Sequence, residues 1–185
     1  THCHLDAEEF GVDADALREQ AAAAGVRLIV VPAVAPANFA AVRGFSGRRV
    51  GAHCVYALGI HPMAVDRAPE DAVARLRAEL TARIDDPALV AVGEIGLDFF
   101  VPGLDRERQE RVYVEQLALA REFDLPVLLH VRRSQDIVLK HLRRMRPVGG
   151  IAHAFNGSHQ QSQAFVDLGL ALGIGMIVDA AIVVL

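Results

Sequence analysis

The sequence has few of the residues that mark secreted and membrane proteins. Cysteine occurs only twice, at Cys3 and Cys54, so no disulfide framework is available, and this number suits a reducing compartment. No apolar run reaches the roughly 18 residues of a membrane-spanning helix, and no charged leader with an apolar core is readable. We therefore expect a cytoplasmic protein with no membrane partner.

Lysine is almost absent as well. Lys140 is the only one, so arginine supplies nearly all the positive charge of a chain whose net charge is −4. Such a chain has no global basic field that would attract nucleic acid, and any anionic substrate must be held by a local site. No obligatory protein partner is readable from the sequence either.

The glycine-rich loops GxGxxG and GxxxxGK[ST] are also missing, which argues against a doubly wound nucleotide-binding fold. What the sequence does have is a regular alternation of short apolar runs with segments of helical pattern. Apolar runs of this kind are typical of parallel strands that are covered on both faces. Their frequent repetition favours an α/β fold of the (β/α)₈ TIM-type barrel class. The 185 residues, 52% of them hydrophobic, suffice for a single domain over 1–185.

The pattern gives approximate bounds for these elements. Buried strands are expected at 26–31, 53–60, 89–93, 125–130, 149–153, 168–174 and 180–185, and residues 2–5 have the character of another strand end. Helices are expected at 13–24, 36–46, 69–84, 105–123, 134–145 and 158–167. Asp13, Ser134 and Ser158 are expected to cap three of them.

His2 and His4 are separated by a single residue. In a strand, residues i and i+2 point to the same side, so the two imidazoles can bind one cation while Cys3 points away. Taken alone, such a pair is more often two ordinary histidines near a terminus.

Three further polar residues end apolar runs. Glu94 follows LVAVG, His130 follows LPVLL and His153 follows GGIA. Each one alone has a simpler explanation, a salt bridge for the glutamate and a hydrogen-bonded core position for a histidine. Active sites of (β/α) barrels lie at the carboxyl ends of the strands. Four strand ends that obey this rule together therefore predict a metal site.

Five ligands exceed the need of one tetrahedral ion. We therefore expect two divalent cations, with zinc, magnesium or manganese as candidates, and Glu94 as the group that bridges them. Many barrel hydrolases use a carboxylated lysine as the bridge, but Lys140 falls within a helical stretch and cannot reach the site from a strand end.

Other polar residues near these strand ends are candidates for substrate contact. Arg132 follows His130 by two residues and projects to the same side if the strand continues. A guanidinium there suits a phosphate, so Glu94 and Arg132 are the candidate catalytic residues. His61, in GIHP after another strand, is a weaker candidate, either for substrate binding or for supporting the metal ligands from behind, and Asp98 is expected only to orient its neighbours.

The remaining histidines are expected to lie outside the site. His53 starts its predicted strand and so faces the inactive end of the barrel. His141 and His159 fall in helical segments and are expected on the surface.

The motifs together resemble those of a known family. THCHLD at 1–6, GIHP at 59–62, VGEIGLDFF at 92–100, LPVLLHVRRS at 125–134 and HAFNGS at 153–158 look like the TatD family of metal-dependent deoxyribonucleases, within the amidohydrolase-like superfamily. The resemblance runs over essentially the whole chain in the family's order. It implies a (β/α) barrel and a divalent-metal-dependent phosphodiesterase that typically acts on DNA ends. By motif matching it assigns metal binding to His2, His4, Glu94, His130 and His153, and phosphate binding to Arg132.

The chain departs from the family pattern at its end. The motif Glu-Thr-Asp-(Ala/Ser)-Pro, whose aspartate binds metal in the family, does not occur, and Asp179 is no substitute because it precedes its predicted strand. The runs 168–174 and 180–185 are separated only by 175–179, whereas parallel neighbours need a crossover of about a dozen residues. A (β/α)₈ barrel also typically has about 250 residues. We therefore expect a barrel that is incomplete at the C-terminal end, with a segment missing near 175–179 and another after Leu185.

Three functions stay open at this point. The first is a deoxyribonuclease acting on DNA ends or single strands, since a recessed site in a net-negative protein suits one or two phosphates. The second is a hydrolase of a small-molecule amide, lactone or ester, which the presence of Arg132 and the absence of a bridging lysine disfavour. The third is an inactive metal-binding scaffold, which the missing aspartate motif favours.

Overall fold

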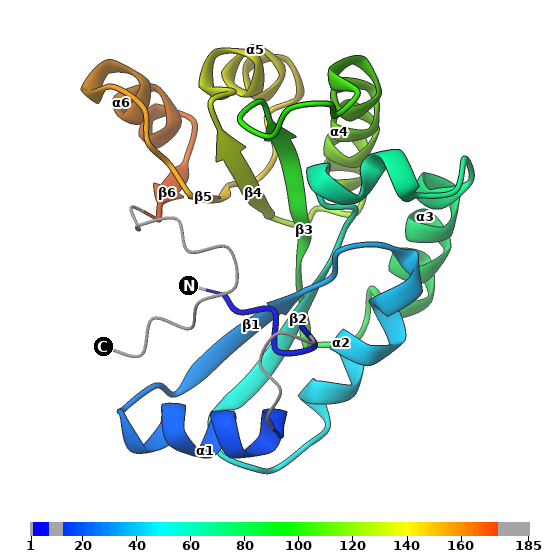
Figure 1. Cartoon of the computed structure of the whole chain (residues 1–185), viewed down its shortest axis with the longest axis vertical. Helices are drawn as coiled ribbons and strands as arrows, with labels where there is room; N and C mark the ends of the chain where they lie inside the picture. Colours follow the sequence, from blue (N-terminus) through cyan, green and yellow to red (C-terminus); the bar gives the residue numbers. More distant parts are fainter. Residues whose placement is uncertain (1, 8–12, 174–185) are drawn as a thin grey trace.

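The computed structural model describes residues 2–7 and 13–173, and strands and helices alternate along it (Figure 1). The helices are α1 (Ala14–Ala23), α2 (Phe39–Ser46), α3 (Ala72–Arg83), α4 (Arg106–Glu122), α5 (Gln135–Met145) and α6 (His159–Asp167). Two short 3-10 helices are η2 (Pro36–Asn38) and η3 (Pro62–Arg67). The strands are β1 (Leu28–Pro32), β2 (His53–Leu58), β3 (Leu89–Asp98), β4 (Val127–Arg132), β5 (Gly150–His153) and β6 (Leu170–Leu172).

The six strands form one parallel sheet, and their order in the sheet follows the chain from β1 to β6. Figure 1 shows the strands curling around the middle of the molecule with the helices on the outside. The segment 2–5 adds a single bridge, between His2 and Val30 of β1. The predicted fold class is therefore confirmed: the described residues form an incomplete (β/α) barrel of the TIM type.

Side-chain caps explain where several helices begin. Asp13 accepts a hydrogen bond from the Asp15 backbone N–H at 3.0 Å, and Ser158 forms a capping box with Gln161, so both predicted caps are confirmed. The predicted cap at Ser134 is wrong. Its hydroxyl donates to the carbonyl oxygen of Leu97 at 2.7 Å, and thereby ties the start of α5 to β3.

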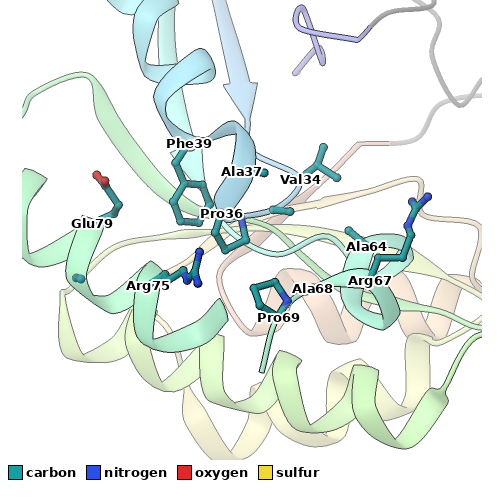
Figure 2. Close-up of a pocket in the computed structure, with 12 residues that line it drawn as sticks. Val34, Pro36, Ala37, Phe39, Ala64, Arg67, Ala68, Pro69, Arg75 and Glu79 are labelled. Atoms are coloured by element: carbon teal, nitrogen blue, oxygen red, sulfur yellow. The ribbon is translucent and has the colours of Figure 1, made fainter. Parts of the chain in front are cut away.

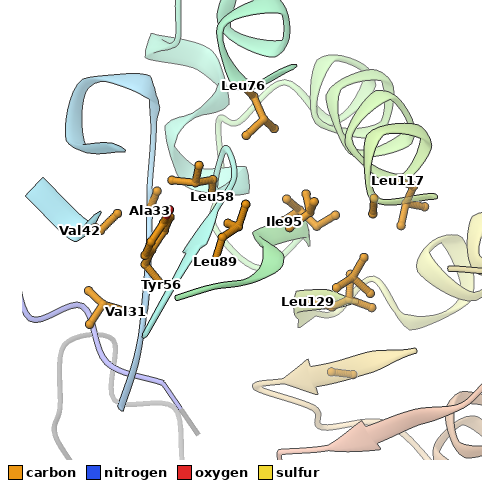
Figure 3. Close-up of a cluster of buried hydrophobic side chains, with 14 of the residues drawn as sticks. Val31, Ala33, Val42, Tyr56, Leu58, Leu76, Leu89, Ile95, Leu117 and Leu129 are labelled. Carbon is orange, nitrogen blue, oxygen red and sulfur yellow. The ribbon is translucent and has the colours of Figure 1, made fainter. Parts of the chain in front are cut away.

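Successive side chains of each strand point to opposite faces of the sheet, so the core has two layers. Leu58 and Leu129 belong to a large cluster between sheet and helices, and Figure 3 shows Leu76 of α3 and Leu117 of α4 pointing toward it. The opposite, concave face of the sheet carries a smaller buried cluster of Ala57, Ala91 and Leu128. Polar residues that share the concave face are thus held on a scaffold packed from behind by helices.

The length of β3 differs most from the sequence prediction. The pattern predicts a strand over 89–93, but β3 continues to Asp98, so Glu94 lies inside the strand and not at its end. The register with β4 shifts at Glu94, which is the extra residue of a β-bulge. Val92 and Ile95 both pack in the helix-facing layer although they are three positions apart. The bulge therefore inverts the alternation and turns Glu94 to the concave face.

Of the three histidines expected outside the site, two lie where the sequence predicts and one does not. His53 is exposed at the start of β2 and His159 is exposed at the start of α6, as predicted. The surface prediction for His141 is wrong, because its ring is buried where α5 packs on α4. Its Nε2 lies 2.6 Å from a carboxylate oxygen of Glu110, which satisfies the buried ring.

The end of the chain is described only in part. Within the predicted strand 168–174, β6 covers Leu170–Leu172. The predicted strand 180–185 and the short connection 175–179 lie outside the described residues. The single-domain organisation over 1–185 and the missing segments therefore stay predictions. In the part of the chain that the structure describes, no helix is both long and apolar enough to cross a membrane.

The close approach of β3 and β4 depends on Gly96. Gly96 pairs with His130, its φ is +143°, and a Cβ there would lie 2.1 Å from the His130 carbonyl oxygen. We predict that Gly96→Ala lowers the free energy of unfolding by about 2–4 kcal/mol, since it adds both strain and overlap. Denaturant titration measures this loss.

Gly44→Ala is the matched control. Gly44 lies in α2 and a Cβ there would meet no heavy atom within 4 Å, so a gain of about 0.5–1 kcal/mol is expected from helix propensity. Equal effects of the two substitutions would contradict the role given to Gly96.

Candidate metal centre

The site is built around the carboxylate of Glu94, which is 1% exposed. Its Oε2 lies 3.1 Å from Nε2 of His2 and 3.3 Å from Nε2 of His4, and its Oε1 lies 3.3 Å from Nδ1 of His130. The structure therefore brings together four of the five residues that the sequence predicts as metal ligands.

The N-terminal segment positions the two histidines of the HxH pair. The Cys3 backbone N–H donates to the Val30 carbonyl at 3.0 Å, so the segment lies along β1 in extended form. His2 and His4 then point to one side, with ring centroids 5.5 Å apart, while Cys3 packs against the helix-facing core. The predicted alternation is confirmed.

His153, the fifth predicted ligand, ends β5 and stands in register with His130 on β4. Its ring centroid lies 4.2 Å from that of His2. The Nδ1 atoms of His153 and His2 are buried and have no hydrogen-bond partner among the described residues. Buried imidazole nitrogens without a partner beside a carboxylate are the donor set that a divalent cation needs.

Asp98 fixes the ring of His130. The Nε2–H of His130 donates to Asp98 Oδ2 at 2.9 Å, because an ionised carboxylate can only accept. With Nε2 engaged by Asp98, Nδ1 is the nitrogen of His130 that faces Glu94, where it holds a proton in the absence of metal and can offer its lone pair to a cation that displaces that proton. A carboxylate that orients a histidine in this way is typical of metal centres. Asp98 thus orients its neighbour, as the sequence predicts.

His61 is placed differently from the other histidines. It precedes η3, and its Nδ1 accepts a hydrogen bond from the Met63 backbone N–H at 3.2 Å. The neutral ring therefore carries its proton on Nε2, which lies 3.2 Å from His130 Nδ1 and 3.8 Å from Glu94 Oε2. A nitrogen that holds a proton donates a hydrogen bond and does not bind a cation. This geometry suits the substrate contact expected of His61.

Electrostatics favour a negative centre surrounded by imidazoles. Burial alone would raise the pKa of Glu94, but the charge of His2 and hydrogen bonds from His130, His2 and His4 hold that pKa well below its usual range. Burial opposes the charged form of His130 as well, yet hydrogen bonds to Asp98 and Glu94 raise its pKa to about 9. For His61 burial prevails and lowers the pKa to about 3. A bound cation would take the place of the protons shared with Glu94.

Two sets of ligand atoms lie within 4.8 Å of one another, His2–His4–Glu94 and His61–Glu94–His130. Glu94 belongs to both sets: its Oε2 faces His2 and His4, and its Oε1 faces His130. His61 belongs to the second set as a neighbour only, because its Nε2 carries the proton. The described residues therefore include a buried His/Glu group that can hold a divalent metal.

The predicted continuation of β4 through Arg132 is confirmed, and Arg132 follows His130 on the same face. Its Nη1 lies 3.8 Å from Asp98 Oδ2, and its guanidinium carbon lies 4.0 Å from the ring centroid of Phe100. The sequence prediction missed Phe100. The signal was available in the two phenylalanines that directly follow the end of β3.

A groove of about 750 Å³ lies next to this centre, between the β1–α2 connection and η3 with α3 (Figure 2). Pro36 stands in one wall and Pro69 in the other, and the lining is largely apolar. None of the candidate metal ligands lines it. A backbone hydrogen bond links the two features, in which the His61 N–H donates to the Val34 carbonyl at 2.9 Å.

Comparison with known proteins places this geometry in a family. A family model described as TatD related DNase matches residues 1–181. The chain belongs to the TatD family. The resemblance stated from the sequence motifs is therefore confirmed.

Relatives of this TatD-family chain are named as metal-dependent hydrolases or nucleases. An uncharacterized metal-dependent hydrolase, YjjV of Escherichia coli K12, is 42% identical over 177 residues, which cover 95% of this chain and 66% of YjjV. The crystal structure of YjjV has a TM-score of 0.84 at 40% identity and covers 93% of this chain and 65% of its own. A protein named 3'-5' ssDNA/RNA exonuclease TatD, from Salmonella typhimurium, is 32% identical over 92% of this chain and 64% of its own length. The chain thus spans just under two thirds of these relatives.

Metal binding at Glu94 gives a direct prediction. Addition of manganese or zinc to the metal-free full-length protein should raise its melting temperature, since a ligand at 100 times its Kd adds about 2.7 kcal/mol. Glu94→Gln, which keeps the shape and removes the charge, should abolish most of this shift. Glu79→Gln is the control, because Glu79 pairs with Arg43 on the surface, away from the candidate ligands. A full metal-dependent shift in Glu94→Gln would rule out the assignment.

Proposed function

We propose that the protein is a divalent-metal-dependent phosphodiester hydrolase, a deoxyribonuclease that acts on DNA ends or single strands. The observation that carries the proposal is the buried carboxylate of Glu94, with His2 and His4 at one oxygen and His130 at the other, and with the guanidinium of Arg132 on the same face. The name of the Salmonella relative, an exonuclease of single-stranded DNA and RNA, supports this substrate class.

The ligands of the proposed centre are His2, His4, Glu94, His130 and His153, with Glu94 shared between two cations. Zinc, magnesium and manganese are the candidates. Divalent cations bound here would supply Lewis acidity at the phosphate and lower the pKa of water to near neutrality. Asp98 keeps His130 in the tautomer that presents Nδ1 to the centre.

Arg132 and His61 are the proposed substrate contacts. The guanidinium of Arg132 is held by Asp98 and Phe100 and has the geometry for two parallel hydrogen bonds to a phosphate. His61 stays neutral because burial lowers its pKa to about 3, so its Nε2–H can donate to a phosphate oxygen throughout the physiological range. His61 contacts His130, and Arg132 follows His130 by two residues on β4, so both donors would hold a phosphate near Glu94.

Nuclease assays on the full-length protein test the proposal. A chelator and Glu94→Ala should each lower cleavage of a single-stranded oligonucleotide by at least about 100-fold, and Arg132→Gln should lower kcat/KM by about 100-fold. Arg77→Gln is the control for loss of a positive charge, because Arg77 pairs with Glu122 on the exposed α3–α4 surface.

Each other outcome points to a different function. Cleavage that neither the chelator nor Glu94→Ala affects would refute the proposal. Turnover of amides, lactones or carboxylic esters in place of phosphodiesters would identify a small-molecule hydrolase. Stoichiometric metal without any turnover would identify an inactive scaffold.

The site also predicts a weak dependence on salt. One or two phosphate contacts at a recessed site give a log–log slope of affinity against salt no steeper than about −1.5 for a single strand. Oligonucleotide affinity measured between low and physiological salt gives this slope. A much steeper slope would show a long phosphate track that the net charge of −4 does not provide.

A further inference from the structure

Phe100 is a large apolar side chain left exposed beside a buried polar site. It lies two residues after the end of β3 and is 46% exposed. The other exposed large hydrophobic side chains of the described residues are aliphatic: Val26, Leu28, Ile84, Val148 and Val166. Among the described residues, an exposed aromatic ring of this kind thus occurs only next to the candidate metal centre.

The backbone at Phe100 is fixed by the same carboxylate that orients the site. Asp98 Oδ1 accepts hydrogen bonds from the N–H groups of Phe100 at 2.9 Å and Val101 at 3.1 Å. Asp98 Oδ2 meanwhile accepts from His130 and lies 3.8 Å from Arg132. A single buried side chain therefore sets the position of the ring relative to both the candidate ligand and the candidate phosphate contact.

Two guanidinium groups accompany the ring. The carbon of the Arg132 guanidinium lies 4.0 Å from the ring centroid of Phe100, and that of Arg133 lies 4.7 Å from it. Phe99, the preceding residue, has a different role, since it packs against the helix-facing core and contacts Arg106. The exposed ring and the cations around it thus form a small aromatic and cationic surface at the rim of the site.

Nucleic-acid bases stack on aromatic rings and on guanidinium planes. The phosphate that joins such a base to the chain needs a cation nearby, and Arg132 already contacts the ring. From this juxtaposition we infer that Phe100, together with Arg132 and Arg133, holds a nucleobase next to the scissile phosphate. Phe100 is then a specificity-determining residue that restricts the substrates to nucleotides.

This inference rests on the proposed function and narrows its substrate class. The test compares a single-stranded oligonucleotide whose terminal residue bears a base with one that ends in an abasic tetrahydrofuran residue, at each end in turn. The full-length protein should prefer the base-bearing end about 10-fold in kcat/KM, which is the fold-change that corresponds to 1.4 kcal/mol.

Substitution of the ring should remove that preference. In Phe100→Ala the ratio between the two substrates should fall below about 2-fold, and Phe100→Trp, which restores a flat ring, should keep it at 10-fold or more. Phe99→Leu is the matched control and should keep the wild-type ratio. Because the readout is the ratio of kcat/KM for two substrates in the same variant, a general loss of folding or activity lowers both values and leaves the ratio unchanged. A ratio that Phe100→Ala leaves at the wild-type value, or a wild-type protein that shows no preference, would overturn the inference.

A binding experiment separates this inference from the proposed function. Affinities of thymidine 5′-monophosphate and of 2-deoxyribose 5-phosphate are measured by calorimetry, with and without Phe100→Ala. If the protein cleaves no phosphodiester but binds the nucleotide more tightly through Phe100, the nuclease proposal fails and the stacking site stands. If cleavage is found but neither assay depends on Phe100, the nuclease proposal stands and the stacking site fails.

Discussion

A buried carboxylate that no backbone group neutralises must be paired, because an isolated charge in the interior is too costly to keep. For Glu94 the pairing comes from His2, His4 and His130, which are contributed by the N-terminal segment and by β4. β4 pairs directly with β3, whereas the N-terminal segment is bridged to β1 and reaches Glu94 only across the concave face of the curled sheet. The complete site therefore requires the curled sheet, and the stability of Glu94 inside the protein depends on the histidines or on the cations that they bind.

The backbone of β3 provides the geometry that this pairing requires. The bulge at Glu94 turns the carboxylate to the concave face, and Gly96 allows β4 to approach closely enough for His130 to reach it. Asp98, at the end of the same strand, then fixes the His130 ring and the loop that carries Phe100. A single strand thus connects the ligand, the orienting carboxylate and the rim of the site.

Local periodicity in the sequence predicts much of the fold and of the candidate metal centre. The strand–helix alternation gives the fold class, and the HxH spacing with the strand-end positions of His130 and His153 gives the residues that meet at the centre. The role of Glu94 is predicted from the sequence, but the true length of β3 is not readable, because Glu94 interrupts the apolar run and thus resembles its end. The burial of His141 is hidden for a similar reason, since its partner Glu110 lies 31 residues away on another helix. The role proposed for Phe100 depends on its contact with Arg132 on β4, which the sequence alone does not reveal.

Anomalous X-ray diffraction from crystals of the full-length protein grown with manganese tests the central claim most directly. The account predicts anomalous density on both sides of the Glu94 carboxylate, within about 2.2 Å of its oxygens, with the imidazoles of His2 and His4 on one side and that of His130 on the other. The account would be contradicted if the manganese density lay away from Glu94, or if manganese were fully occupied elsewhere on the barrel while this cluster held none.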